Sequence, residues 1–160
     1  MTKREVAVLV GSAVCSVMLG VGVAYSGLFS SDEESLPPVP PVPTDYAAKH
    51  MPQGWWTDPK VLAEGEKVYT GEANQMVNCA SCHDKDGQPK KKGARDLRDP
   101  KNTTRFSDSF WFWRVAEGVP KTKMKAWKKF LSEEQIWQVI AYEHQFSHGF
   151  KPAEHTDYKP

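Results

Sequence analysis

Two cysteines three positions apart, followed directly by a histidine, are the residues of this sequence with the clearest capacity for chemistry. They form the segment CASCH at residues 79–83. Thiolates and imidazoles bind transition metals, and two cysteines at this spacing can also form a redox-active disulfide. The rest of the sequence must therefore distinguish a redox site, a zinc site and a covalently attached haem.

A redox disulfide needs a particular structural setting and a zinc ion needs further ligands, and the sequence offers little of either. Dithiol redox sites at this spacing are typical of a βαβ setting, and no alternating strand pattern of useful length is present. Structural zinc needs four ligands, but the third cysteine, Cys15, lies in an apolar N-terminal run. The remaining zinc ligands would be His144 and His148, one helical turn apart but far beyond the usual finger spacing. Such a site would leave His83 without a role.

The order Cys-x-x-Cys-His is the attachment signature of c-type haem. Two intervening residues bring both sulfurs to one edge of the porphyrin, and the histidine that follows projects onto the ring face. We therefore predict thioether bonds at Cys79 and Cys82 and iron coordination by His83. The motif occurs once in the sequence, so the prediction is a single covalent haem c.

A second axial ligand is expected from Met124 in the segment GVPKTKMKAW. This segment contains the helix breakers Gly118 and Pro120 and separates two predicted helices. A loop at that place can cross the far face of the haem. Methionine ligation favours a raised potential and electron transfer, whereas an open position would allow ligand chemistry.

Other candidates for this ligand are less well situated. Met76 is three residues before the first cysteine and cannot reach across the ring, and Met51 is remote from the motif. His144 or His148 would give a bis-histidine haem of lower potential. Both histidines also suit the C-terminus of a helix, where a cation is favoured by the dipole.

Basic residues gather near the predicted distal segment. From Cys82 to the C-terminus the sequence has 16 basic and 11 acidic residues, although the net charge of the whole chain is only +1 and gives no indication of nucleic acid binding. We predict a docking patch for an acidic redox partner, since such patches steer association. Its residues are Lys121, Lys123, Lys125, Lys128 and Lys129, with Lys90–Lys92 as a second run.

The N-terminal residues predict a membrane anchor. No charged residue occurs from Val6 to Ser31, and about 20 apolar residues span a bilayer as a helix. Lys3 and Arg4 before this run place the N-terminus in the cytoplasm and the remainder outside. A cleaved signal peptide ending near residues 24–26 is the alternative. We assign residues 1–30 to a single transmembrane helix in the cytoplasmic membrane.

The exported part divides into three segments. Residues 31–57 are acidic and proline-rich and predict a semi-rigid linker. A helical domain follows at residues 58–150, and residues 151–160 form a C-terminal tail. Helices are predicted over 58–69, around the CASCH motif, over 107–117 and over 132–146, with a polar loop at 84–105.

Taken together, these features resemble class I cytochrome c over residues 58–146. The resemblance is carried by Gly65, Tyr69, the CASCH motif, Gly87, Met124 and LSEEQIWQVIAY. It implies an all-α fold of three to five helices around one covalently bound haem. It also implies that Gly65 allows Trp137 or Tyr142 of the last helix to approach closely, and that Trp111 or Trp113 packs on the haem.

The sequence departs from the family pattern at two positions. Lys125 follows the predicted methionine ligand where the family usually has proline. The family also often has a Gly-Pro pair whose carbonyl orients the proximal histidine. Here that carbonyl could come from residues 88–89 or from residues 93–95.

The resemblance implies one-electron transfer rather than enzymatic turnover. We expect a membrane-tethered periplasmic c-type cytochrome, either a carrier or a haem subunit of a respiratory chain. It would act between a quinol-oxidising complex and a terminal oxidase or another acceptor. The alternative is a haem enzyme or gas-binding protein with an open iron site.

Overall fold

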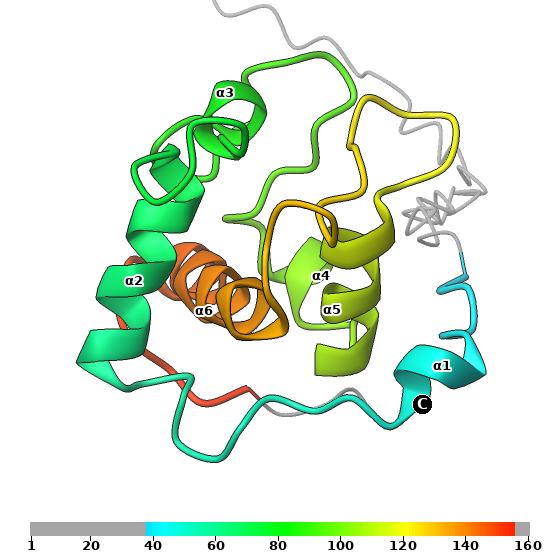
Figure 1. Cartoon of the computed structure of the whole chain (residues 1–160), viewed down its shortest axis with the longest axis horizontal. Helices are drawn as coiled ribbons and strands as arrows, with labels where there is room; N and C mark the ends of the chain where they lie inside the picture. The colour runs from blue at the N-terminus through cyan, green and yellow to red at the C-terminus, as the bar shows by residue number, and fades with distance from the viewer. Residues whose placement is uncertain (1–37, 156–160) are drawn as a thin grey trace, which may run out of the picture. The chain divides into compact units, whose positions relative to one another are not determined.

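Helices account for the regular structure of residues 38–155, the part of the chain that the computed structural model describes (Figure 1). They are α1 (Thr44–Ala47), α2 (Pro59–Thr70), α3 (Ala80–His83), α4 (Pro100–Thr103), α5 (Asp108–Glu117), α6 (Glu133–His144) and the 3-10 helix η1 (Gln145–His148). No strand occurs in this range, in agreement with the predicted all-α class. Between residues 38 and 155, every helix falls short of the length and apolar character needed to cross a bilayer. The predicted membrane helix lies outside the described residues.

Local capping signals explain where the long helices begin and end. The Asp58 side chain accepts hydrogen bonds from the first turn of α2, and Gly71 ends this helix with a positive φ of 84°. At α6, the side chains of Ser132 and Gln135 form a reciprocal capping box. The predicted helices over 58–69 and 107–117 are confirmed to within a residue or two. The last one changes to 3-10 geometry after His144.

Two short helices were not predicted from the sequence. Helix α4 lies inside the expected loop, where the Asp99 side chain caps a single turn that begins at Pro100. Helix α1 lies inside the expected linker. A turn of four residues has too few positions to show a helical period, so such elements leave little trace in a sequence pattern.

A glycine sets the crossing of α2 and α6. A Cβ atom added at Gly65 would lie 2.1 Å from the carbonyl oxygen of Gln138 and 2.9 Å from Cβ of Tyr142. The helices can approach this closely only because residue 65 has no side chain. The expectation for Tyr142 is thereby confirmed, whereas Trp137 instead packs on Phe112 with ring centroids 4.5 Å apart.

Residues 44–57, which we grouped with the linker, pack on the helical domain. Met51 and Trp56 are buried in the main hydrophobic cluster, 9% and 7% exposed. The Met51 amide donates to the Asp108 carboxylate at 2.8 Å, and the Tyr46 hydroxyl donates to Glu117. These contacts join the segment before α2 to both ends of α5.

Candidate functional site

The CASCH segment is held against the C-terminal end of α2. The amide of Cys79 donates to the carbonyl of Tyr69 at 3.0 Å, and the amide of His83 donates to the carbonyl of Cys79 at 2.9 Å. The Asn78 side chain accepts from the Ser81 amide at 2.9 Å and so caps the turn. Cys79 and Cys82 are half-buried free thiols on this turn. Both sulfurs are therefore presented from one short, anchored helix.

The imidazole of His83 is oriented by a backbone carbonyl. Its Nδ1 lies 3.0 Å from the carbonyl oxygen of Arg95, so Nδ1–H is the donor and Nε2 keeps a free lone pair for a metal. Burial lowers the pKa of His83, which favours the neutral, ligating form. Of the two segments considered for this acceptor, residues 93–95 supply it.

Tyr69 secures the residue that follows the motif, a role that we did not predict. Its hydroxyl donates to the Asp84 carbonyl at 2.7 Å. Asp84 has a φ of 50°, a left-handed conformation that is uncommon outside glycine. The chain turns away from α3 at this point, and burial raises the pKa of Tyr69, which keeps it a hydrogen-bond donor. No spacing rule in the sequence would have revealed this contact.

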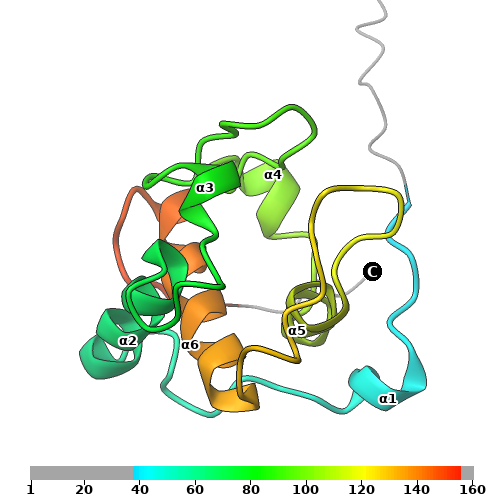
Figure 2. The same ribbon diagram turned by 45° about the horizontal axis from the view of Figure 1, so that its top comes forward.

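Met124 lies in the loop formed by residues 118–127, called here the distal loop. In Figures 1 and 2 this yellow loop and α3 both lie in the upper part of the fold, apart from each other, with the loop to the right. The amide of Val119 donates to the Met124 carbonyl at 3.1 Å, and the amide of Trp127 donates to the Ala116 carbonyl at 3.1 Å. The first bond closes the loop on itself, and the second fastens it to the end of α5. Met124 is half-buried and packs against the core.

Gly118 makes this loop geometry possible. Its φ of 72° and ψ of −169° are essentially restricted to glycine. A Cβ atom there would also lie 2.5 Å from the Met124 carbonyl oxygen. The expected helix breaker at residue 118 therefore directly determines where residue 124 lies.

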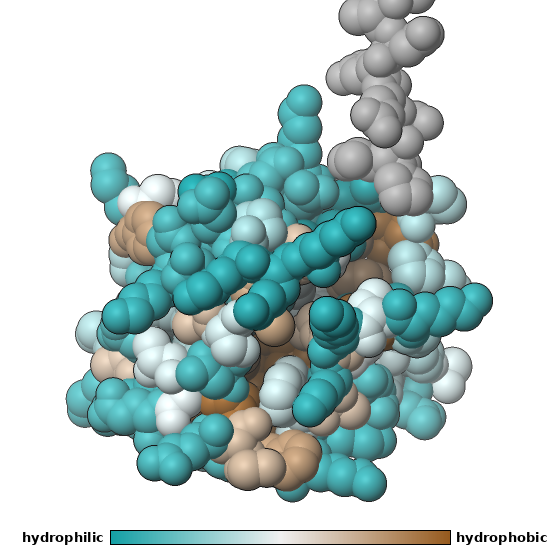
Figure 3. Space-filling model, turned by 90° about the horizontal axis from the view of Figure 1, so that it is seen from above, coloured by the Kyte–Doolittle hydropathy of each residue, from teal (hydrophilic) through white to brown (hydrophobic). Residues whose placement is uncertain are grey.

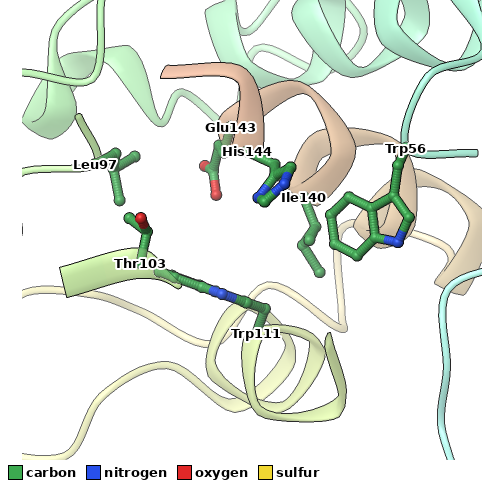
Figure 4. Close-up of a pocket in the computed structure, with 7 residues that line it drawn as sticks. All are labelled: Trp56, Leu97, Thr103, Trp111, Ile140, Glu143 and His144. Carbon is green, nitrogen blue, oxygen red and sulfur yellow. The ribbon is translucent and has the colours of Figure 1, made fainter. Parts of the chain in front are cut away.

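A mostly apolar cavity lies among the segment before α2, the loop before α4, and helices α4, α5 and α6 (Figure 4). It is lined by Trp56, Leu97, Thr103, Trp111, Ile140, Glu143 and His144. Of the two tryptophans expected at a haem, Trp111 lines this cavity. Trp113 instead stacks under the guanidinium of Arg114, 3.6 Å from the ring centroid.

Of the alternative axial ligands, Met51 and Met76 do not line this cavity, whereas His144 does. Met76 is 67% exposed, and Met51 belongs to the core. The ring of His144 packs between Trp56 and His148, with centroid distances of 4.8 and 4.5 Å. Within residues 38–155, no three side chains of His, Cys, Asp or Glu come together to hold a metal ion. The zinc alternative thus finds no ligand set there.

The predicted docking lysines are all exposed. Lys128 forms an ion pair with Glu117 at 2.6 Å, while the other four form none within the described range. Figure 3 views the molecule from the side of α3 and the distal loop and shows apolar surface between hydrophilic side chains. Hydrophilic side chains therefore surround apolar groups on this face.

The family of the chain follows from a sequence match. The profile described as cytochrome c oxidase, cbb3-type, subunit III matches residues 61–142, which is half of the chain. The chain belongs to this family. The match includes the CASCH motif and the distal loop of this cytochrome domain, and it identifies a c-type cytochrome that transfers electrons. The cysteine pair is consistent with covalent haem c.

Solved structures of c-type cytochromes are also similar to the chain. The c-type cytochrome KustC0563 is 27% identical, with 54% of this chain and 96% of that chain covered and a TM-score of 0.44. Cytochrome cL from Hyphomicrobium denitrificans is 23% identical, with 57% and 51% covered and a TM-score of 0.44. A search of the curated proteins finds no match. The family assignment therefore rests on the sequence profile.

The residues present fit a covalently bound haem. Two free thiols project from one turn, and the adjacent imidazole has its Nδ1 occupied by a backbone acceptor. Apolar and aromatic side chains line a cavity in the same helical domain, and the half-buried side chain of Met124 lies in the distal loop. Together these groups could attach a porphyrin, coordinate its iron and limit the access of water.

Proposed function

We propose that this chain is a membrane-tethered periplasmic cytochrome with one haem c, attached at Cys79 and Cys82 and coordinated by His83 and Met124. It transfers single electrons between a quinol-oxidising complex and a terminal oxidase or another acceptor. The observation that carries the proposal is the contact of His83 Nδ1 with the Arg95 carbonyl beside a correctly spaced pair of thiols. Haem iron, when bound, supplies the one-electron couple.

The protein contributes orientation and exclusion of water. The Arg95 carbonyl fixes the tautomer of His83 and increases the basicity of Nε2. The hydrogen bonds of the distal loop would hold Met124 near one position beside a bound haem, which would limit reorganisation during electron transfer. Trp111 and Leu97 provide apolar walls that favour the state of lower charge and so raise the potential.

Covalent attachment is the first test. The full chain is expressed in a host with a cytochrome c maturation system, beside a Cys79→Ala/Cys82→Ala variant. After denaturation and acid-acetone extraction, we expect the wild-type protein to retain pigment with c-type reduced-minus-oxidised bands and the variant to retain none. Wild-type protein without retained pigment would overturn the proposed function.

The lysines of the distal loop are proposed to steer an acidic partner. Ferricyanide, a small anionic oxidant, is a suitable probe because its encounter rate depends on local charge. Lys121→Gln/Lys123→Gln should slow oxidation of the reduced protein and weaken its dependence on salt. Lys60→Gln, which changes an exposed residue of α2, is the matched control. Equal rates of oxidation by ferricyanide in all three proteins would show that these lysines do not steer an anionic partner.

Localisation is proposed from the uncharged run that follows Lys3 and Arg4. Full-length protein should fractionate with the cytoplasmic membrane, and its haem domain should be digested by protease added to spheroplasts. Recovery of the intact chain in the soluble periplasmic fraction would indicate release from the membrane instead.

A further inference from the structure

Glu143 is a carboxyl group inside the cavity that the proposed electron transfer does not use. It belongs to α6, and in Figure 4 its carboxyl points into the cavity, beside Leu97 and Thr103. It makes no ion pair with any residue of the described range. Other glutamates on α6, such as Glu133 and Glu134, are exposed in the first turn of the helix. A carboxyl in this inward position requires an explanation.

Glu143 is joined to the haem attachment turn through packed neighbours. The adjacent Tyr142 packs on Tyr69 with ring centroids 5.4 Å apart, and the Tyr69 carbonyl accepts from the Cys79 amide. Burial raises the pKa of Tyr69 on α2 and that of the Cys79 thiol, and the charge of Glu143 raises both further. Such interactions require proximity, because charge effects fall with distance. A porphyrin bound at Cys79 would therefore lie near this carboxyl.

No cation among residues 38–155 compensates the carboxylate form. Burial alone raises the pKa of Glu143 to about 8. The titratable groups that face it from other segments, Tyr69 and Cys79, are neutral at pH 7. On its own helix, burial and the neighbouring rings of His155 and His148 lower the pKa of His144 to about 3, so the His144 ring is neutral as well. Thr103 of α4 and Trp111 of α5 also line the cavity, and neither side chain ionises near pH 7.

We propose that Glu143 couples electron transfer to proton transfer in this cytochrome, an inference that rests on the proposed haem function. The Glu143 carboxyl would release one proton to solvent when a bound haem is oxidised by the redox partner. The carboxylate would take one proton up when the haem is reduced by its donor. Electron and proton thus leave and return in equal number.

The sign of the effect follows from electrostatics. Ferric iron carries one more positive charge than ferrous iron, so it stabilises the carboxylate and lowers the pKa of Glu143. The potential should therefore fall as the pH rises between the pKa values of the oxidised and reduced states. The limiting slope for one proton per electron is about 59 mV per pH unit.

The experiment is a redox titration of the haem-loaded full chain across neutral pH, followed by visible spectrum. Wild-type protein should show the falling potential, and Glu143→Gln should be flat at the value that the wild type approaches in acid. Glu134→Gln, an exposed site on the same helix, should behave as the wild type does. Redox-induced infrared difference spectra should also lose a protonated carboxyl band on oxidation in the wild type and not in Glu143→Gln.

The outcomes separate the two proposals. A flat profile in pigmented wild-type protein would overturn the role of Glu143 and leave the cytochrome function intact. A slope that persists in Glu143→Gln would assign the proton to the haem propionates and would overturn it equally. Absence of covalent pigment, seen before any titration, would overturn both.

Discussion

The two sides of the candidate haem site are built in different ways. On the proximal side, the CASCH turn is fixed to the end of α2 by bonds from Tyr69 and Asn78, residues within a short stretch of the same chain. On the distal side, Met124 depends on a loop fastened to α5, with Gly118 as its hinge. The geometry of the proximal side is therefore determined by residues close in sequence, whereas that of the distal side depends on how the loop packs on α5. We expect the distal side to be the easier one to disrupt without unfolding the protein.

Removal of the distal ligand should produce the largest functional change. Met124→Ala leaves the proximal side intact, so covalent haem should be retained while the sixth position opens. We expect rapid carbon monoxide binding to the reduced protein and a substantially lower potential, because methionine ligation raises it. Met76→Ala, at an exposed methionine near the motif, is the control. An unchanged potential in Met124→Ala would reject this ligand.

The α2–α6 crossing should be the most sensitive point of the proximal side. Alanine normally improves a helix by about 1 kcal/mol relative to glycine, but at Gly65 its Cβ would lie 2.1 Å from the Gln138 carbonyl oxygen. Overpacking against backbone should dominate and cost on the order of 3 kcal/mol. Denaturant unfolding of Gly65→Ala and wild type would measure this. If Gly65→Ala were more stable than the wild type, α2 and α6 could move apart to accept the methyl group without a cost in stability.

The parts that the sequence predicted well are those governed by neighbouring residues. Asp58, Gly71 and Ser132 mark helix ends through bonds made within one turn, and the expected boundaries follow them closely. The CASCH spacing likewise presents both sulfurs from a single turn. Such features need no knowledge of the remaining fold, because short-range geometry determines them.

The parts that were missed depend on tertiary contacts. The acceptor for His83 is a main-chain carbonyl, which every residue has, so its identity becomes visible only when the loop is folded. Trp56 lies in a stretch whose composition resembles a linker, yet it packs on His144. Glu143 gave no signal in the sequence, because a charged residue on an amphipathic helix usually faces water. The Glu143 side chain points inward because of how α6 packs against the other elements, which the sequence pattern does not show.

Two glycines allow the distal side to be tested with a matched pair. Gly93 has a φ of 87°, and no atom lies within 4 Å of the position that a Cβ atom would take there. Gly93→Ala should therefore cost only the strain of a left-handed residue, about 1–2 kcal/mol. Gly118→Ala adds contacts under 3 Å with the distal loop backbone and should cost a further ~1–3 kcal/mol. Gly118→Ala should also weaken the optical signature of methionine ligation, and Gly93→Ala should not. Equal behaviour of the two variants would show that the loop adjusts without cost.

The smallest expected effect concerns the hydroxyl that holds the end of the CASCH turn. Tyr69→Phe keeps the buried ring, which packs on Tyr142 and Phe146 at centroid distances of 5.4 and 5.3 Å. It removes the bond from the hydroxyl to the Asp84 carbonyl at 2.7 Å and the longer one to the His83 carbonyl at 3.3 Å. We expect a loss of about 1 kcal/mol in unfolding free energy, with haem attachment retained because the bonds within the turn remain. If Tyr69→Phe instead prevented haem retention, the proximal side would depend on a single distant hydroxyl, and the contrast between the two sides would fail. Denaturant midpoints and retained pigment, measured on the same preparations, distinguish these results.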